Sequence, residues 1–123
     1  HQHIDALDLT RQLAETVSHH VGDVEAVLLA LNEFKMSYTF KLAYQFLFHA
    51  LPAYQVSQLL THLAEGILQH CNQLASQELQ RQHGGIDGGS FAVTITEAIL
   101  RVSNWMGSIT RLMPILFNMD IMA

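Results

Sequence analysis

Apolar residues recur every three or four positions along most of the chain, which is the spacing of one face of an α-helix. The first such segment ends in His19 and His20, and Gly22 follows it as a helix stop. Its apolar positions are Ile4, Leu7, Leu13, Ala14, Val17 and Val21. This pattern predicts an amphipathic helix over about residues 4–21.

The second apolar segment extends over about residues 23–50. Asp23 is a residue type favoured at a helix N-cap, and Pro52 ends the segment because proline disfavours helical geometry in the residue before it. A second apolar stripe makes its later half apolar on nearly all sides: Phe40, Tyr44, Leu47, Phe48 and Leu51. We predict a central helix with neighbours on several sides, and Ser37–Thr39 as the place where it would break.

The third segment places apolar residues on one face and mostly amides and acids on the other. Its apolar positions are Val56, Leu59, Leu60, Leu63, Ile67, Cys71, Leu74 and Leu79. Four glycines then fall within residues 84–89, and glycines at this density resist regular structure. We expect a helix over about 53–83, followed by a flexible linker over 84–89.

The last segment permits two interpretations. Phe91–Ile95 is β-branched enough for a short strand. Thr94 and Glu97, however, have the spacing of a helical capping box. Apolar residues continue after them at helical spacing: Ile95, Ala98, Ile99, Val102, Met106, Ile109 and Leu112. Since no second strand is available for pairing, we expect a helix over about 95–113, ended by Pro114.

Together these segments predict an all-α fold, either a four-helix bundle or a helical array of long antiparallel helices, in a single helical domain over residues 1–123. No run of 18 residues is apolar throughout, so we expect no transmembrane segment. The formal net charge is −5, with 6 lysines and arginines scattered along the chain, which argues against nucleic acid as a partner.

The single cysteine, Cys71, rules out an intrachain disulfide and fits a reducing compartment, so we expect a cytoplasmic protein. The start His1-Gln2-His3 has neither the basic nor the apolar region of a signal peptide. Because the chain starts with His1 rather than methionine, we expect it to be either an engineered product with histidines left by cloning or an excised fragment of a longer protein.

The eight histidines are the first residues to test for chemistry. Metal sites on helices commonly use ligands three or four residues apart, and the sequence has no such histidine pair and no Glu-x-x-His. His62 and His70 lie about two turns apart and need further ligands to hold one ion. We expect no metal and no cofactor. A ligand- or metal-binding bundle that uses His49, His62, His70 or methionines from separate helices is the alternative.

A catalytic centre is not apparent in the sequence either. Cys71 falls on the apolar face of its helix, where a thiol is usually inert, and there is no Gly-x-Ser-x-Gly turn. The glycines of 84–89 lack the Gly-Lys-Ser/Thr ending of a phosphate-binding loop. Surplus apolar residues in the second helix and after Leu112 indicate a surface for a protein partner or a second copy of the chain.

Four stretches of the sequence occur in an order that is found in one protein family: Leu31–Lys35, Phe40–Tyr44, Val56–Glu65 and Leu79–Gly84. Over about residues 24–84, this order resembles the helical segment that precedes a nucleotidyltransferase domain in the glutamine synthetase adenylyltransferase family. The resemblance implies a Leu-x-x-Phe element, a basic helical stretch, and a Leu-Ala-Glu helix that leads into the catalytic domain.

The chain departs from the family pattern where that catalytic domain would begin. The family has a strand, a glycine-rich turn and a Ser-Asp-x-Asp metal site that would hold Mg²⁺ against the triphosphate. Here Ser90–Val93 has the character of the strand, Thr94–Glu97 replaces the turn, and no Asp-x-Asp occurs. Lys35 also stands alone where the family has several arginines. We therefore predict no enzyme activity, and a non-catalytic helical scaffold or protein-interaction module derived from that helical region.

Overall fold

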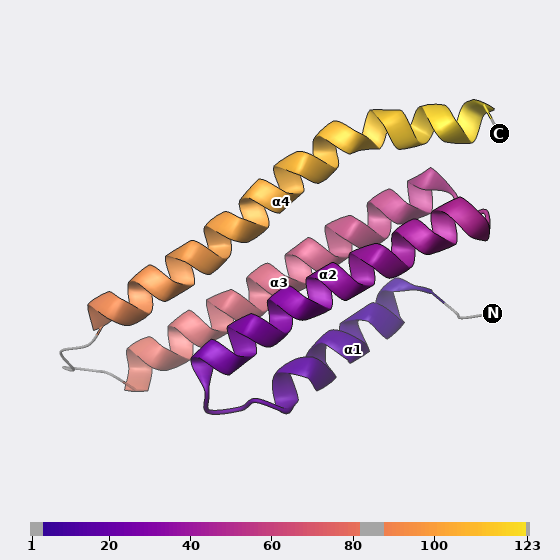
Figure 1. The fold of residues 1–123 in the computed structure, drawn as a ribbon. Helices are drawn as coiled ribbons and strands as arrows, with labels where there is room; N and C mark the ends of the chain where they lie inside the picture. Colours follow the sequence, from indigo (N-terminus) through magenta and orange to yellow (C-terminus); the bar gives the residue numbers. More distant parts are fainter. Residues whose placement is uncertain (1–3, 82–87, 123) are drawn as a thin grey trace.

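The computed structural model describes residues 4–81 and 88–122 of the chain. Within these ranges the backbone forms four α-helices and no strand. The helices are α1 (Ala6–Ser18), α2 (Val24–Phe48), α3 (Ala53–Arg81) and α4 (Gly88–Met122). Successive helices run in opposite directions (Figure 1). The prediction of an all-α fold with long antiparallel helices is confirmed.

The antiparallel pair of α2 and α3 forms the centre of the molecule. α1 packs against both helices on one side, and α4 packs chiefly along α3 on the other (Figure 1). The side-chain amide of Gln55 donates a hydrogen bond to the carbonyl oxygen of Ile4 at 3.3 Å, which links the segment before α1 to α3. Each of the outer helices therefore rests on the central pair.

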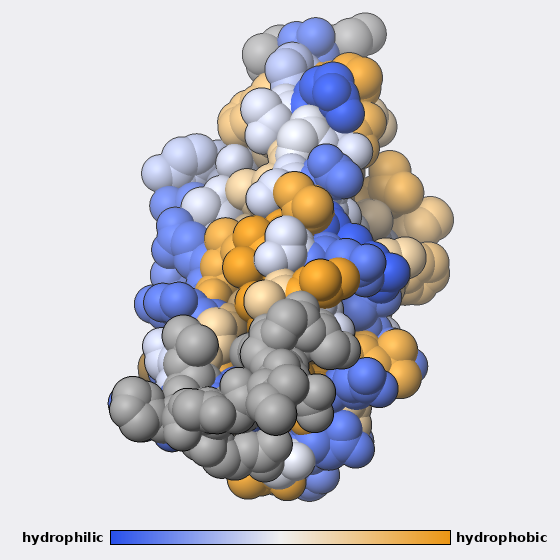
Figure 2. Space-filling model, turned by 90° about the vertical axis from the view of Figure 1, so that its left-hand side faces the viewer, coloured by the Kyte–Doolittle hydropathy of each residue, from blue (hydrophilic) through white to orange (hydrophobic). Residues whose placement is uncertain are grey.

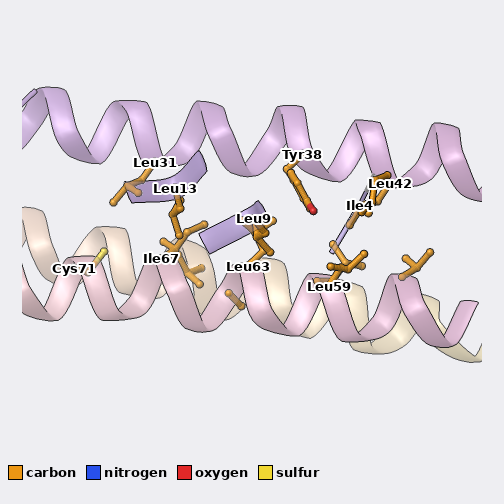
Figure 3. Close-up of a cluster of buried hydrophobic side chains, with 14 of the residues drawn as sticks. Ile4, Leu9, Leu13, Leu31, Tyr38, Leu42, Leu59, Leu63, Ile67 and Cys71 are labelled. Atoms are coloured by element: carbon orange, nitrogen blue, oxygen red, sulfur yellow. The ribbon is translucent and has the colours of Figure 1, made fainter. Parts of the chain in front are cut away.

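The hydrophobic core lies mainly between α1, α2 and α3. Figure 3 shows Leu9 and Leu13 of α1 reaching into the space between α2 and α3, toward Leu63 and Ile67. Leu63 is fully buried, and burial of a leucine side chain stabilises a protein by about 1.5–3 kcal/mol. α4 adds Val102 to this layer.

Side-chain caps define the starts of α1 and α2. The carboxylate of Asp5 accepts a hydrogen bond from the backbone N–H of Asp8 at 2.7 Å, and that of Asp23 accepts one from Ala26 at 3.1 Å. Each bond satisfies an N–H group that has no partner inside the helix. The predicted N-cap at Asp23 is confirmed, and α2 continues through residues 37–39 without a break.

The start of α4 differs from the prediction. The helix begins at Gly88 rather than near residue 95, so the alternative of a strand over 91–95 was wrong and the predicted capping box lies inside the helix. Ile95 and Val102 are buried, and their packing favours a helix that extends back over Gly88 and Gly89 despite the poor helix propensity of glycine. The rest of the predicted linker, residues 84–87, lies outside the described residues.

Pro114 does not end α4 as predicted. Proline removes the hydrogen bond to the carbonyl of Thr110, which bends a helix but need not stop it. Figure 1 shows α4 bending in its C-terminal part. Met113 and Leu116, on either side of Pro114, pack against the core and keep the continuing helix on the bundle. The helix therefore extends to Met122 rather than to residue 113.

Candidate functional site

A stripe of apolar side chains lies on the face of α2 opposite the core. Its members, called the α2 stripe below, are Met36, Phe40, Tyr44, Leu47 and Phe48. Phe40 is 73% exposed, and the rings of Tyr44 and Phe48 pack on each other with centroids 5.0 Å apart. We expected the later half of this helix to have neighbours on several sides. In the part of the chain that the structure describes, the α2 stripe faces solvent instead.

A second exposed apolar group lies near the end of α4. Leu112, Ile115 and Met119 are spaced three and four residues apart and are all exposed. α2 and α4 end toward the same end of the molecule (Figure 1). At the opposite end, where α2 begins, hydrophobic side chains also reach the surface among hydrophilic ones (Figure 2).

None of the described helices is long and apolar enough to cross a membrane.

The histidines considered as ligands do not meet at one point. His49 caps the end of α2, with its ring centroid 5.4 Å from that of Tyr44. His62 and His70 line a small cavity of about 130 Å³ between α1 and α3, and burial lowers the pKa of His70. Within residues 4–81 and 88–122, no three His, Cys, Asp or Glu side chains are placed to share a metal ion.

The described residues examined for catalysis lie within helices. Cys71 is 1% exposed, and burial raises the pKa of its thiol, so the protonated, unreactive form dominates at neutral pH. Residues 90–97, where the family has a strand and a glycine-rich turn, form part of α4. The backbone geometry that would present a nucleotide-binding turn is therefore replaced by helix at these positions.

Lys35 is a charged residue whose burial the sequence analysis did not predict. It is 6% exposed, and its Nζ lies 5.5 Å from the centroid of the Trp105 ring on α4. Burial lowers the pKa of Lys35, and the nearby positive charge of Arg101 lowers it further. A signal was present in the sequence, because Lys35 falls between Leu31 and Tyr38 in the register of the buried face of α2.

The residues that the structure describes form an all-helical module with exposed apolar side chains on α2 and near the end of α4. Comparison with protein families then shows which family the chain belongs to. The family described as glutamate-ammonia ligase adenylyltransferase matches residues 2–93, and the chain belongs to this family. The match extends beyond both ends of the resemblance recognised over residues 24–84.

Individual relatives are also adenylyltransferases by name. The chain is 36% identical over 74 residues to a bifunctional glutamine synthetase adenylyltransferase/adenylyl-removing enzyme of Xanthomonas oryzae pv. oryzae (strain MAFF 311018), covering 60% of this chain and 8% of that protein. A protein of the same name from Xanthomonas campestris pv. campestris (strain B100) is 37% identical over 73 residues, covering 59% and 8%. The matched part thus spans about 8% of the length of these relatives. No solved structure matches the chain significantly.

Proposed function

We propose that this chain is a non-catalytic helical segment of a glutamine synthetase adenylyltransferase, and that the α2 stripe binds the remaining part of that protein. The α2 stripe is the observation that carries the proposal. The small share of the relatives' length that the chain matches supports this choice of occupant, because most of such a protein lies outside the matched segment.

The composition of the α2 stripe favours a protein partner. Three of its five members are aromatic, and aromatic residues and methionine are enriched in protein interfaces. Full burial of one such side chain is worth about 1.5–3 kcal/mol, so two or three of them suffice to hold a helix against a neighbouring domain. Left in water, an apolar group of this size favours aggregation.

The absence of catalytic chemistry supports a structural role for this segment. The sequence has no Asp-x-Asp pair to hold a magnesium ion, and residues 90–97 are helical where the family resemblance implies a strand and a nucleotide-binding turn. Adenylyl transfer would then belong to other parts of the protein, in a cytoplasmic setting. A metal-binding role for His49, His62 or His70 stays a prediction for which the geometry supplies no additional support.

A chimera tests the proposal. Residues 4–81 of this chain replace the corresponding segment of the Xanthomonas oryzae relative, and Phe40→Glu is introduced into both the chimera and the isolated chain. In the chimera the substitution would place an unpaired carboxylate in a buried interface, so we expect the melting temperature to fall by several degrees. In the isolated chain the position is exposed, and we expect a change within about ±0.5 kcal/mol.

Leu7→Glu is the matched control, because Leu7 is an apolar residue of α1 that is 81% exposed and lies outside the α2 stripe. We expect this substitution to change neither protein. A chimera that tolerates Phe40→Glu as well as Leu7→Glu would contradict the proposal. If instead the isolated chain forms a dimer that Phe40→Glu dissociates, the occupant of the α2 stripe is a second copy and the choice made above is wrong.

A further inference from the structure

A cavity of about 350 Å³ lies between α2, α3 and α4. Its apolar wall is formed by buried side chains of all three helices: Leu31, Ile67, Cys71 and Val102. Charged residues of α2 and α4 also line the cavity: Glu25 and Lys35 of α2, and Glu97 and Arg101 of α4. The volume falls within the usual range of small-molecule sites, and such sites combine an apolar wall with a few polar groups.

Lys35 is the unusual member of this lining. Its side chain is almost completely buried, and among the described residues its ammonium group contacts the Trp105 ring without an ion pair to a carboxylate. A buried charge normally has a paired group of opposite sign, because an unpaired charge is costly to remove from water. Arg101 of α4 lines the same cavity and adds a second positive charge to its wall. The cavity therefore presents two basic side chains from two helices, together with the carboxylates of Glu25 and Glu97.

We propose that this cavity binds a small organic acid, with its carboxylate held by Lys35 and Arg101 and its hydrocarbon part against the apolar wall. A single carboxylate suits the site better than a phosphate does. Glu25 and Glu97 line the same cavity and balance the two cations in formal charge, so their repulsion would be about twice as strong for a dianion as for a monoanion. The apolar wall favours a ligand with several carbon atoms over a bare inorganic ion.

Trp105 allows the proposal to be tested directly, because it is the single tryptophan of the chain and lies beside Lys35. Sodium hexanoate is titrated into the purified chain at constant ionic strength while tryptophan fluorescence is recorded, and calorimetry gives an independent dissociation constant. We expect saturable binding of hexanoate, at least about ten-fold weaker binding of the neutral analogue 1-hexanol, and no saturable binding of inorganic phosphate.

Substitutions then locate the binding site. Lys35→Met keeps the length of the side chain without its charge, and we expect it to weaken hexanoate binding at least about ten-fold. Arg101→Gln changes an exposed residue of α4 and should weaken binding several-fold. Lys41→Met is the matched control, since Lys41 also lies over an aromatic ring, that of Tyr38 at 5.7 Å, but does not line the cavity. We expect hexanoate to bind this variant as it binds the original chain.

Several results would overturn the proposal. Absence of saturable hexanoate binding, equal binding of 1-hexanol, or tighter binding of phosphate each contradicts a small organic acid as the ligand. An unchanged dissociation constant in Lys35→Met would show that Lys35 does not hold the carboxylate. An equal loss in Lys41→Met would show that the effect is one of overall charge and not of the cavity. If circular dichroism shows that Lys35→Met is unfolded, Arg101→Gln decides, and unweakened binding there contradicts the proposal.

Discussion

Gly66 of α3 lies where α1 approaches this helix closely, and replacing it with alanine should destabilise the protein. A Cβ atom at this position would lie 2.6 Å from Cδ2 of Leu13. Leu13 is 2% exposed, so its side chain cannot move away without displacing other core residues. Alanine is better than glycine in a helix by about 1 kcal/mol, whereas overpacking of a core costs about 1–3 kcal/mol. We expect a net loss of about 1 kcal/mol in the free energy of unfolding.

Gly107→Ala in α4 is the control for this substitution, because a Cβ atom at Gly107 would meet no atom within 4 Å. We expect it to stabilise the chain by about 0.5–1 kcal/mol through helix propensity alone. Urea unfolding followed by circular dichroism measures both variants, and the midpoints should move in opposite directions. If Gly66→Ala stabilises the chain as much as Gly107→Ala does, α1 and α3 do not pack as described.

Three further predictions concern other positions. Ala50 has a φ of +56°, a left-handed conformation that costs about 1–2 kcal/mol in residues other than glycine, so Ala50→Gly should raise the melting temperature measured by circular dichroism. Pro114→Ala restores an N–H donor for the carbonyl of Thr110, and hydrogen exchange should find this new amide protected. Burial lowers the pKa of His70, so the folded state binds fewer protons than the unfolded state and stability should fall as pH drops below the ordinary value of 6.5. Urea midpoints between about pH 7.5 and 5.5 should show this loss in the original chain and in His62→Gln, and a smaller loss in His70→Gln.

The existence of the first three helices could be predicted from the sequence because their signals are local. The apolar face assigned to the first helix was wrong at Leu7 and Val21, which are 81% and 80% exposed. The N-cap at Asp23 and the proline at residue 52 mark ends that short-range chemistry determines. Apolar spacing along residues 53–83 then assigned the buried face of α3 correctly, including Leu63 and Ile67. Such signals need no knowledge of the neighbouring helices.

The bounds of α4 could not be predicted in the same way. The capping spacing of Thr94 and Glu97 and the presence of Pro114 both favour ends that the structure does not have. Packing of α4 along α3 outweighs both signals, because a helix held by tertiary contacts tolerates poor local sequence. The contact between Lys35 and the Trp105 ring could not be predicted for the same reason, because it depends on how α4 packs beside α2.

The exposed face of α2 was predictable only in part. Surplus apolar residues indicated an interaction surface, yet the spacing alone could not separate a helix buried on all sides from one with a face open to solvent. The structure makes this distinction at Phe40 and Phe48, which lie opposite the buried register of Leu31 and Leu42.

Photo-crosslinking from position 40 tests the proposed docking of the α2 stripe most directly. The chimera with the Xanthomonas oryzae relative carries p-benzoylphenylalanine in place of Phe40, or in place of Leu7 as the control, and cross-linked peptides are identified by mass spectrometry. We expect position 40 to cross-link within one molecule to residues outside the exchanged segment, and position 7 to give far fewer such products. Cross-links from position 40 that join only the exchanged segments of two molecules, or that are no more frequent than those from position 7, would contradict the proposal.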